Sequence, residues 1–524
     1  MVAVPDRAPN ARKYIRVATE SARTRRVGNS KLAGFRTVER NALGSDEAWR
    51  DHSPFHDGAM DLKLIAQHLV PALRVSLRAP GLCLTGLDGG RPLDDEQREP
   101  WIKIKYGVTR PDDWVGVVPA TARFVRARGA PQETLDLIVK VNPRQGLARN
   151  LIPWIAARNH VVLDRPFLHY RTAAELDRTA ERELHVYELA GKMNVLREVL
   201  PRCYGWAHDP ETGEHALFLE CLTGVERLDA TGASADWPPD AIDAALRVAA
   251  RWQAAFWGAN DKSLAWAGPR PTTAAMVAAT SLWRGLLNDA RSRFPHIITQ
   301  NVWRRRYALI ETMSDWHKVK DALPATLAHN DFNQRNVGFR TAMPPESMPG
   351  EGEAADRAAH AEHQATTNTR LARRLLPRLK SKEPSAKNSA PAPGAKANGA
   401  HPDVGAIQHM MRSNADSSIV VLDWEIAQCN TAARDLVELL TFVLPPTAER
   451  EAIDRHVETL RDALIKGGVS TGIERDAFFE GFRSEIRVQS INRVGLQLLF
   501  GAQFQLAYLA RINATVERLL DLYH

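Results

Sequence analysis

The chain has 524 residues, of which 44% are hydrophobic and 25% are charged, a composition typical of a globular protein with two or three domains. This composition excludes collagen-like, coiled-coil and wholly disordered chains. Lysine and arginine outnumber aspartate and glutamate by 69 to 62, and residues 1–40 contain ten basic and three acidic residues. The whole net charge of +7 therefore lies in this basic segment, and the neutral remainder argues against a dedicated nucleic-acid-binding domain.

The tail, the cysteines and the apolar segments bear on where the protein resides. We expect residues 1–45 to form a solvated, disordered tail, although their arginine content also suits an organellar targeting peptide or an arm that contacts RNA. The four cysteines have no metal-binding spacing and suggest no disulfide framework, which favours a reducing compartment. No hydrophobic signal segment is visible, and the apolar stretch 494–510 is too short to span a bilayer. We therefore predict a cytoplasmic protein, with an organellar location as the alternative.

The first part of the chain is predicted to contain one helix followed by strands. Apolar residues at helical spacing predict a helix over 60–77, which Pro71 is expected to bend or end. The glycine-rich residues 81–93 show no strand pattern. Residues 101–106 and 121–141 alternate between apolar and polar side chains, and a turn sequence within the second segment predicts a hairpin.

The rest of the chain is predicted to be mostly helical. A long helix is expected over 173–193, and residues 215–222 read as a buried strand. Helical spacing dominates after Asp240, and we expect residues 494–510 to form a buried core helix. Strands in the first half and helices in the second indicate an α+β fold.

One segment departs from this pattern. Residues 341–417 are dense in proline, alanine, serine, lysine and asparagine and contain few large apolar side chains. Such a segment cannot bury enough apolar surface to offset its ordering entropy, so we predict a disordered insertion.

The strongest chemical signal is the sequence HNDFNQRN, which contains His329, Asp331 and Asn336, followed after the insertion by Asp423 and Glu425 in VLDWE. Phosphoryl transfer from magnesium-ATP needs a carboxylate that orients the attacking hydroxyl or accepts its proton. It also needs amide and carboxylate oxygens that hold the cation. An Asp and an Asn five residues apart, followed by an Asp that leaves an apolar strand, supply these groups in this order.

These two motifs resemble those of the aminoglycoside phosphotransferase and choline kinase superfamily, including its ecdysteroid-kinase-like branches. The resemblance implies a bilobal protein-kinase-like fold, with a small β-rich N-lobe over 46–222 and a larger helical C-lobe over 223–524 that contains the insertion. It also implies that Asp331 is the catalytic residue, that Asn336 and Asp423 bind Mg²⁺, and that His329 and Glu425 support them.

The same resemblance assigns the ATP site to the N-terminal half. Lys140 stands where the family has its phosphate-binding lysine, and Glu183 stands where the family has the glutamate that pairs with it. The backbone from Glu220 to Leu222 corresponds to the segment that binds adenine. No Walker A or clear GxGxxG sequence precedes Lys140, so the loop that covers the phosphates is left open between residues 85–90 and 107–116.

Gln253 stands where the related families usually have a histidine. Two other features of the C-terminal half are interpreted as structural, and the first is Asp435, which corresponds to an acidic residue at the start of a helix. The tryptophans of this half are expected to pack in the core rather than to form a cage for a cationic ligand, namely Trp252, Trp257 and Trp283.

The first functional hypothesis is an ATP- and Mg²⁺-dependent phosphotransferase that acts on a hydroxyl of a small molecule. Amino alcohols, aminosugars, sterol-like compounds and antibiotics all stay open as acceptors, while the absence of HRD, DFG and APE sequences argues against a conventional protein kinase. The alternatives are a nucleotide-binding pseudokinase or scaffold, and an RNA-associated protein that binds through its tail.

Overall fold

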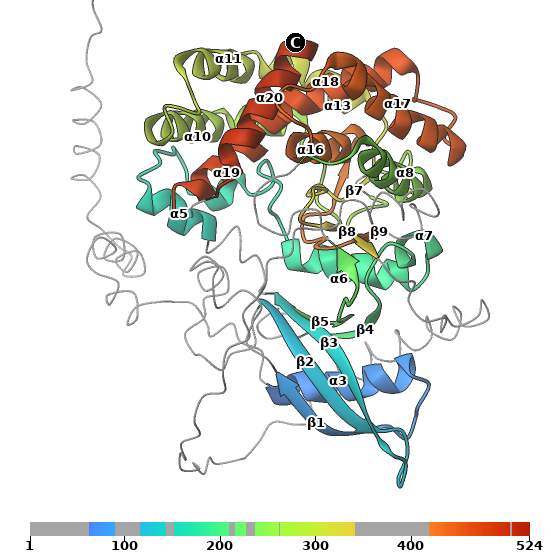
Figure 1. Ribbon diagram of the computed structural model, residues 1–524. Helices are drawn as coiled ribbons and strands as arrows, with labels where there is room; N and C mark the ends of the chain where they lie inside the picture. The colour runs from blue at the N-terminus through green and yellow to red at the C-terminus, as the bar shows by residue number, and fades with distance from the viewer. Residues whose placement is uncertain are drawn as a thin grey trace, which may run out of the picture. The chain divides into compact units, whose positions relative to one another are not determined.

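A five-stranded antiparallel sheet dominates the first part of the described chain (Figure 1). The computed structural model describes residues 62–89, 116–142, 151–208, 215–226, 236–260, 262–340, 419–503 and 506–524. The sheet has the order β1-β2-β3-β5-β4. Its strands are β1 (Cys83–Gly89), β2 (Gly116–Val125), β3 (Gln132–Asn142), β4 (Cys203–His208) and β5 (His215–Glu220).

The alternation of side chains along β3 sets two different environments for its residues. Leu137, Val139 and Val141 are fully buried in a core that they share with α3 (Leu62–Ser76). Because successive side chains of a strand point to opposite faces, Lys140 lies on the other face of the sheet. This face contacts α6 (Thr179–Ala190) through β5.

The strands and the first helix differ from the expectations in three places. Helix α3 does not end at Pro71 but continues through it to Ser76. The hairpin strand begins at Gly116, where it pairs with Val141, five residues before the predicted start. Strand β4 was not predicted, and the strand segment expected at 101–106 lies outside the described residues.

The prediction that residues 81–93 lack a strand was wrong, because β1 pairs along β2 with a bulge between Leu84 and Gly86. A Cβ atom at Gly86 would lie 2.8 Å from the guanidinium of Arg123, so glycine at this position makes room for that side chain. Arg123 in turn forms an ion pair with Asp88 of β1 at 2.9 Å. The glycine content therefore serves close packing of a side chain and does not indicate a loop.

Helix α6 is shorter than the predicted helix 173–193. Glu175 and Arg178 have φ angles of 66° and 51°, which lie in the left-handed region and cannot continue a right-handed helix. The helix therefore starts at Thr179.

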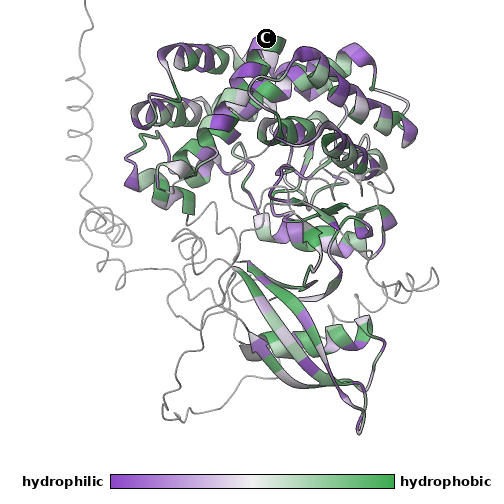
Figure 2. Cartoon of the chain, in the orientation of Figure 1, coloured by the Kyte–Doolittle hydropathy of each residue, from purple (hydrophilic) through white to green (hydrophobic). Residues whose placement is uncertain are grey.

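The second part of the chain is helical. Figure 2 shows hydrophobic and hydrophilic residues mixed along these helices, as expected for helices that bury one face. In α17, for example, the buried apolar residues Ile453, Val457, Leu460 and Leu464 follow a helical spacing. The larger helices are α8 (Pro239–Ala255), α10 (Thr280–Arg293), α11 (Gln300–Glu311), α16 (Ala433–Val443), α17 (Arg450–Lys466), α18 (Arg475–Ile491), α19 (Arg493–Gly501) and α20 (Leu509–Tyr523).

Shorter helical segments connect the larger elements. None of the helices in the described ranges combines the length and the apolar character needed to cross a bilayer. The connecting segments are α5 (Ile152–Arg158), η2 (Phe167–Tyr170), α7 (Asn194–Arg197), α9 (Thr273–Ala278), α12 (Met313–Trp316) and α13 (Lys318–Ala322).

Two small sheets bring the sequence motifs together. Strand β7 (Thr326–Ala328) pairs with β10 (Gln428–Asn430), and β8 (Val337–Arg340) pairs with β6 (Val225–Glu226) and β9 (Ile419–Val421). The residues before and after the insertion therefore lie on neighbouring strands.

The fold is α+β, as the sequence predicts, and one further helix differs from the expectation. The segment expected as one helix over 494–510 is divided, because α19 ends at Gly501 and α20 begins at Leu509. All four cysteines are free thiols. The tail 1–45 and the whole insertion 341–417 lie outside the described residues.

His317 lies between α12 and α13, and its burial leads us to expect that the stability of the protein falls at acidic pH. Its ring is fully buried, and burial together with nearby Lys320 lowers the pKa of His317 to about 4. The unfolded chain, with an ordinary histidine pKa near 6.5, therefore binds the proton more readily than the folded chain. This contribution to stability is complete above pH 6.5 and is lost as the pH falls toward 4.

We expect the free energy of unfolding in urea to fall by about 2 kcal/mol between pH 7 and pH 5 because of this histidine. The variant His317→Gln should remove most of that pH dependence, whereas His169→Gln, at an exposed position, should keep it. An equal pH dependence in His317→Gln and in the wild type would contradict this assignment.

Candidate functional site

An ion pair between the sheet and α6 forms one side of the candidate site. The ammonium of Lys140, at the end of β3, lies 2.8 and 2.7 Å from the two carboxylate oxygens of Glu183 on α6. The amide of Asn142, two residues further along the same strand face, donates to Glu183 at 3.0 Å. Both Lys140 and Glu183 are buried, so the Lys–Glu contact predicted from the sequence is present in a desolvated setting.

Two carboxylates from the turn after β9 complete this group. Lys140 Nζ lies 2.7 Å from Oδ1 of Asp423 and 3.7 Å from Oε1 of Glu425. The side chain of Asp423 is 44% exposed, whereas that of Glu425 is buried. Asp423 has a φ of 61°, a left-handed conformation that costs a non-glycine residue about 1 kcal/mol. Surrounding contacts must hold it there.

The charges of this group shift two pKa values. Burial opposes the charge of Lys140, but Asp423, Glu183 and Glu425 outweigh burial and raise the pKa of Lys140 well above its ordinary value. Burial raises the pKa of Glu183 to about 7, although Lys140 acts in the opposite direction. The Lys140 ammonium is therefore the shared positive charge beside three carboxylates, those of Glu183, Asp423 and Glu425.

The loop between β7 and β8 presents Asp331. Its two carboxylate oxygens each accept a hydrogen bond from an asparagine amide, Oδ1 from Asn333 at 3.0 Å and Oδ2 from Asn336 at 2.8 Å. Asn336 uses the same amide nitrogen to donate to the Asp331 carbonyl at 2.9 Å. The Asp331 carboxylate is thereby fixed in orientation while 21% of its side chain stays exposed.

His329 joins this loop to the turn that carries Asp423. Its Nε2 lies 2.8 Å from the Leu422 carbonyl, and its Nδ1 accepts from the Asp331 amide at 3.2 Å. These partners require a neutral ring protonated on Nε2. The Leu422 amide also donates to the Asn336 carbonyl at 2.8 Å, so the two motifs are connected on both sides of Leu422.

Asp435 holds the start of the same loop. This fully buried residue lies in the first turn of α16, and its carboxylate accepts from the amides of His329 at 3.0 Å and Asn330 at 2.8 Å. Gln253 of α8 donates to it at 3.0 Å. Burial raises the pKa of Asp435. This structural role matches the sequence interpretation of Asp435 and gives Gln253 a partner.

Asn330 anchors the loop to a buried polar network. It has a φ of 69°, and its amide donates to Glu175 at 3.1 Å while its side-chain oxygen accepts from Arg434 at 2.6 Å. Glu175 is the residue whose left-handed backbone precedes α6. Glu175 therefore contacts Asn330 at the point where the left-handed backbone interrupts the predicted helix before α6 begins.

The segment predicted to bind adenine lies at the end of β5. The Glu220 carboxylate forms a bidentate ion pair with Arg340, at 2.9 and 3.1 Å, and accepts from the Arg202 amide. The backbone of Leu222 has no hydrogen-bond partner within the described ranges. Glu220 thus has a structural partner, and Leu222 offers backbone groups to a ligand.

The structure brings the predicted residues into two linked groups. Lys140, Glu183, Asp423 and Glu425 form the first, and the Asp331 loop forms the second. Among the described residues, the side chains that could hold a metal ion as a group are Glu183, Asp423 and Glu425, whose carboxylate oxygens lie within 4.8 Å of one another. Asn336, the other predicted metal ligand, lies on the adjoining loop, where its amide nitrogen bonds Asp331.

Three contacts of the site were not predicted. Asn142 shares the strand face of Lys140 and could have been found from that spacing. Asn333 lies within the Asp331 motif and could have been suspected as a local partner. Arg493, whose guanidinium lies 4.0 Å from Asp331 Oδ1, is far away in the sequence and gave no signal.

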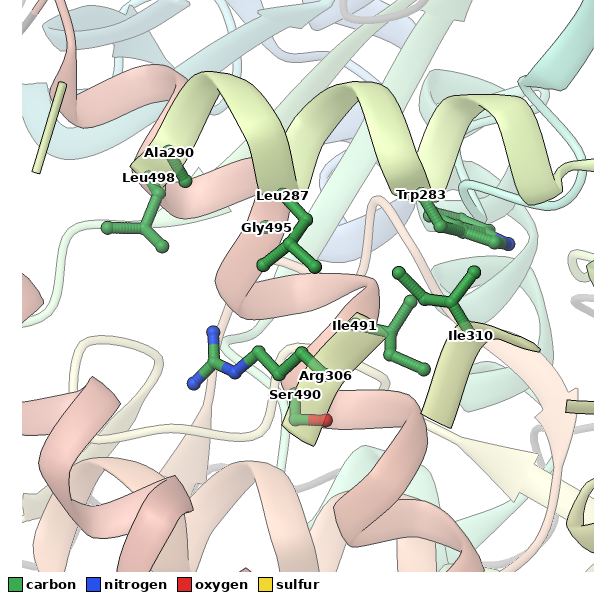
Figure 3. Close-up of a pocket in the computed structure, with 9 residues that line it drawn as sticks. All are labelled: Trp283, Leu287, Ala290, Arg306, Ile310, Ser490, Ile491, Gly495 and Leu498. Carbon is green, nitrogen blue, oxygen red and sulfur yellow. The ribbon is translucent and has the colours of Figure 1, made fainter. Parts of the chain in front are cut away.

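A small cavity in the helical part does not belong to this site. It lies between α10, α11 and the α18–α19 segment and is lined by Trp283, Leu287, Arg306, Ile310 and Gly495, among others (Figure 3). Its volume of about 10 Å³ admits roughly one water molecule and no nucleotide. Trp283 and Trp252 are buried core residues, as predicted, and Trp257 packs against the same core.

Comparison of the chain with protein-family models finds no matching family, and comparison with curated proteins finds no significant match.

Proposed function

We propose that the protein is an ATP- and Mg²⁺-dependent phosphotransferase that phosphorylates a hydroxyl of a small molecule. We also propose that its sheet-containing and helical parts act as the two lobes of a kinase-like enzyme. The observation that carries the proposal is the contact of Lys140 with both Glu183 and Asp423, next to a loop that orients the Asp331 carboxylate.

In this proposal Lys140 binds the phosphates of ATP. Glu183 and Asn142 keep the Lys140 ammonium at the end of β3, so that little reorganisation is needed when the nucleotide binds. Leu222 offers its free backbone groups to adenine, and the Glu220–Arg340 ion pair holds that segment in place.

Asp331 acts on the acceptor. The acceptor oxygen forms a bond to the γ-phosphorus, the bond from that phosphorus to the β–γ bridging oxygen breaks, and ADP leaves. The proton of the acceptor hydroxyl passes to the Asp331 carboxylate, which Asn333 and Asn336 hold in orientation.

The residues present fit a magnesium ion. Three carboxylates face a single ammonium in a mostly buried setting, and this excess of negative charge favours binding of a hard cation. Asp423 and the Asn336 side-chain oxygen would hold the ion, with Glu425 in support. When bound, Mg²⁺ neutralises charge on the phosphate oxygens.

The test is a thermal-shift titration with magnesium-ATP. A ligand that binds only the folded state raises its melting temperature, so the wild type should be stabilised in a metal-dependent manner. Asp423→Ala should lose most of this shift, which corresponds to a weakening of binding by about 100-fold if one carboxylate–cation contact is worth roughly 3 kcal/mol. Asp88→Ala removes an exposed carboxylate of the same sheet that pairs with Arg123, and it should keep the shift.

The outcomes separate the functional alternatives. Stabilisation by magnesium-ATP followed by ADP release in the presence of an alcohol supports the phosphotransferase. Stabilisation without turnover on any alcohol favours a nucleotide-binding pseudokinase or scaffold. Absence of any shift in the wild type would overturn the proposal.

A further inference from the structure

A buried arginine from the C-terminal helices lies beside Asp331. Arg493 is the first residue of α19 and is 8% exposed. Its Nη2 donates to the Asn330 carbonyl and lies 4.0 Å from Asp331 Oδ1. The guanidinium is therefore next to the carboxylate at which the acceptor hydroxyl must bind in the proposed reaction.

Arg493 has donors that the protein does not use. Among the described residues, neither Nε nor Nη1 of Arg493 has a hydrogen-bond acceptor, and Nε is fully shielded from solvent. A buried guanidinium with unpaired donors is costly unless an anion meets them. Gln497, one helical turn later on the same face of α19, has a buried side-chain oxygen that also lacks a partner in the described part of the chain.

Two other buried acidic residues around the Asp331 loop bond to other side chains. Glu438 of α16 accepts hydrogen bonds from Arg434 and Gln489, and Glu175 accepts from Asn330 through Oε2, while its Oε1 has no partner in the described ranges. Arg493 has a long contact with Asp331, and no closer carboxylate pairs with it in the described ranges.

A second arginine lies on the Asp331 loop itself. The Nε of Arg335 donates to the Asn333 side-chain oxygen at 3.3 Å, and Asn333 in turn donates to Asp331. The Arg335 guanidinium also lies over the rings of Phe442 and Tyr508, each at 5.4 Å. Arg493 is thus in direct contact with the Asp331 carboxylate, and Arg335 is joined to it only through Asn333.

We propose that the acceptor molecule carries an anionic group, a carboxylate or a phosphate, that Arg493 binds while Asp331 engages the hydroxyl. This inference rests on the proposed phosphotransferase function and narrows its substrate class. An acceptor with an ammonium group next to the reacting hydroxyl is disfavoured, because it would meet the positive charge of Arg493. The ATP phosphates are assigned to Lys140 on the opposite group of residues, which leaves Arg493 for the acceptor.

The test measures binding of sugars that differ in charge to the protein saturated with Mg²⁺ and a non-hydrolysable ATP analogue. The probes are gluconate, glucose and glucosamine, with inorganic phosphate as a minimal anion, and the readout is the thermal shift converted to an apparent affinity. We expect gluconate and phosphate to stabilise the wild type more than glucose does, and glucosamine to stabilise it least. Arg493→Gln should weaken binding of the anions by at least about tenfold, and Arg493→Lys should restore part of it.

Three controls make the result decisive. Arg487→Gln changes a largely buried arginine of α18 that stacks on Trp316, and it should leave anion binding unchanged. If Arg493→Gln does not fold, Arg493→Met, which also removes the guanidinium and keeps an unbranched side chain, provides the same comparison. Binding of the ATP analogue is measured for each variant, and a loss there in Arg493→Gln would assign the arginine to the nucleotide and overturn the inference.

The inference also fails if the wild type binds no anion or prefers glucosamine. Such a result leaves the phosphotransferase proposal in place when magnesium-ATP still stabilises the protein. Loss of both signals would remove the proposed function itself.

Discussion

Replacing Asp331 with asparagine should reduce turnover by about 1,000-fold with the acceptor that gives ADP release, because a general base that takes the hydroxyl proton contributes a factor of this order. The two carboxylate oxygens each accept an amide hydrogen bond, from Asn333 and Asn336. Asparagine keeps the size of the side chain and can accept one of these bonds. The fold and the nucleotide site should therefore survive.

The measurement compares kcat with the magnesium-ATP thermal shift in the same protein preparation. A loss of kcat with an unchanged shift places Asp331 in the chemical step and not in nucleotide binding. Asn333→Ala is the matched variant, since it removes one partner of the carboxylate and keeps the base. It should reduce kcat by a smaller factor, and an equal loss in both variants would indicate that the loop, rather than the base, has been disrupted.

Parts of the site were predictable from the sequence. Lys140 and Glu183 were assigned by the resemblance of their segments to the phosphotransferase family, and their contact is present. Asp331 and Asn336 are five residues apart in one loop, and this short separation lets the Asn336 amide donate a hydrogen bond to the Asp331 carboxylate. A contact between residues so close in the sequence depends mainly on the conformation of the loop that contains both.

The features that were missed depend on contacts between distant segments. Gly86 belongs to a strand that pairs with β2, where the Arg123 side chain lies against it. Glu175 leaves the helical conformation at a position where its carboxylate meets Asn330, more than a hundred residues away. Arg493 reaches Asp331 only after the C-terminal helices pack, and no pattern around it in the sequence points to this contact.

Replacing Lys140 with methionine should destabilise the protein by about 3–5 kcal/mol at pH 8, the range expected when one partner of a buried ion pair is removed. Glu183 is 1% exposed, and without the ammonium it keeps only the Asn142 amide as a partner. Asp423 and Glu425 add their negative charges nearby. Urea unfolding measures the change, and the magnesium-ATP thermal shift should be lost in the same variant because the phosphates lose their cation.

A double-mutant cycle with Glu183→Gln separates the pair from its surroundings. Glutamine removes the charge that Lys140 balances, so the double variant should recover a large part of the stability lost in Lys140→Met. The raised pKa of Glu183, about 7, gives a second check. In Lys140→Met the carboxyl can take up a proton, so the stability loss should shrink as the pH falls from 8 to 6, since protonation removes the unpaired charge. A loss that is additive in the cycle and independent of pH would show that Lys140 contributes through packing alone, and the electrostatic basis of the phosphate site would have to be abandoned.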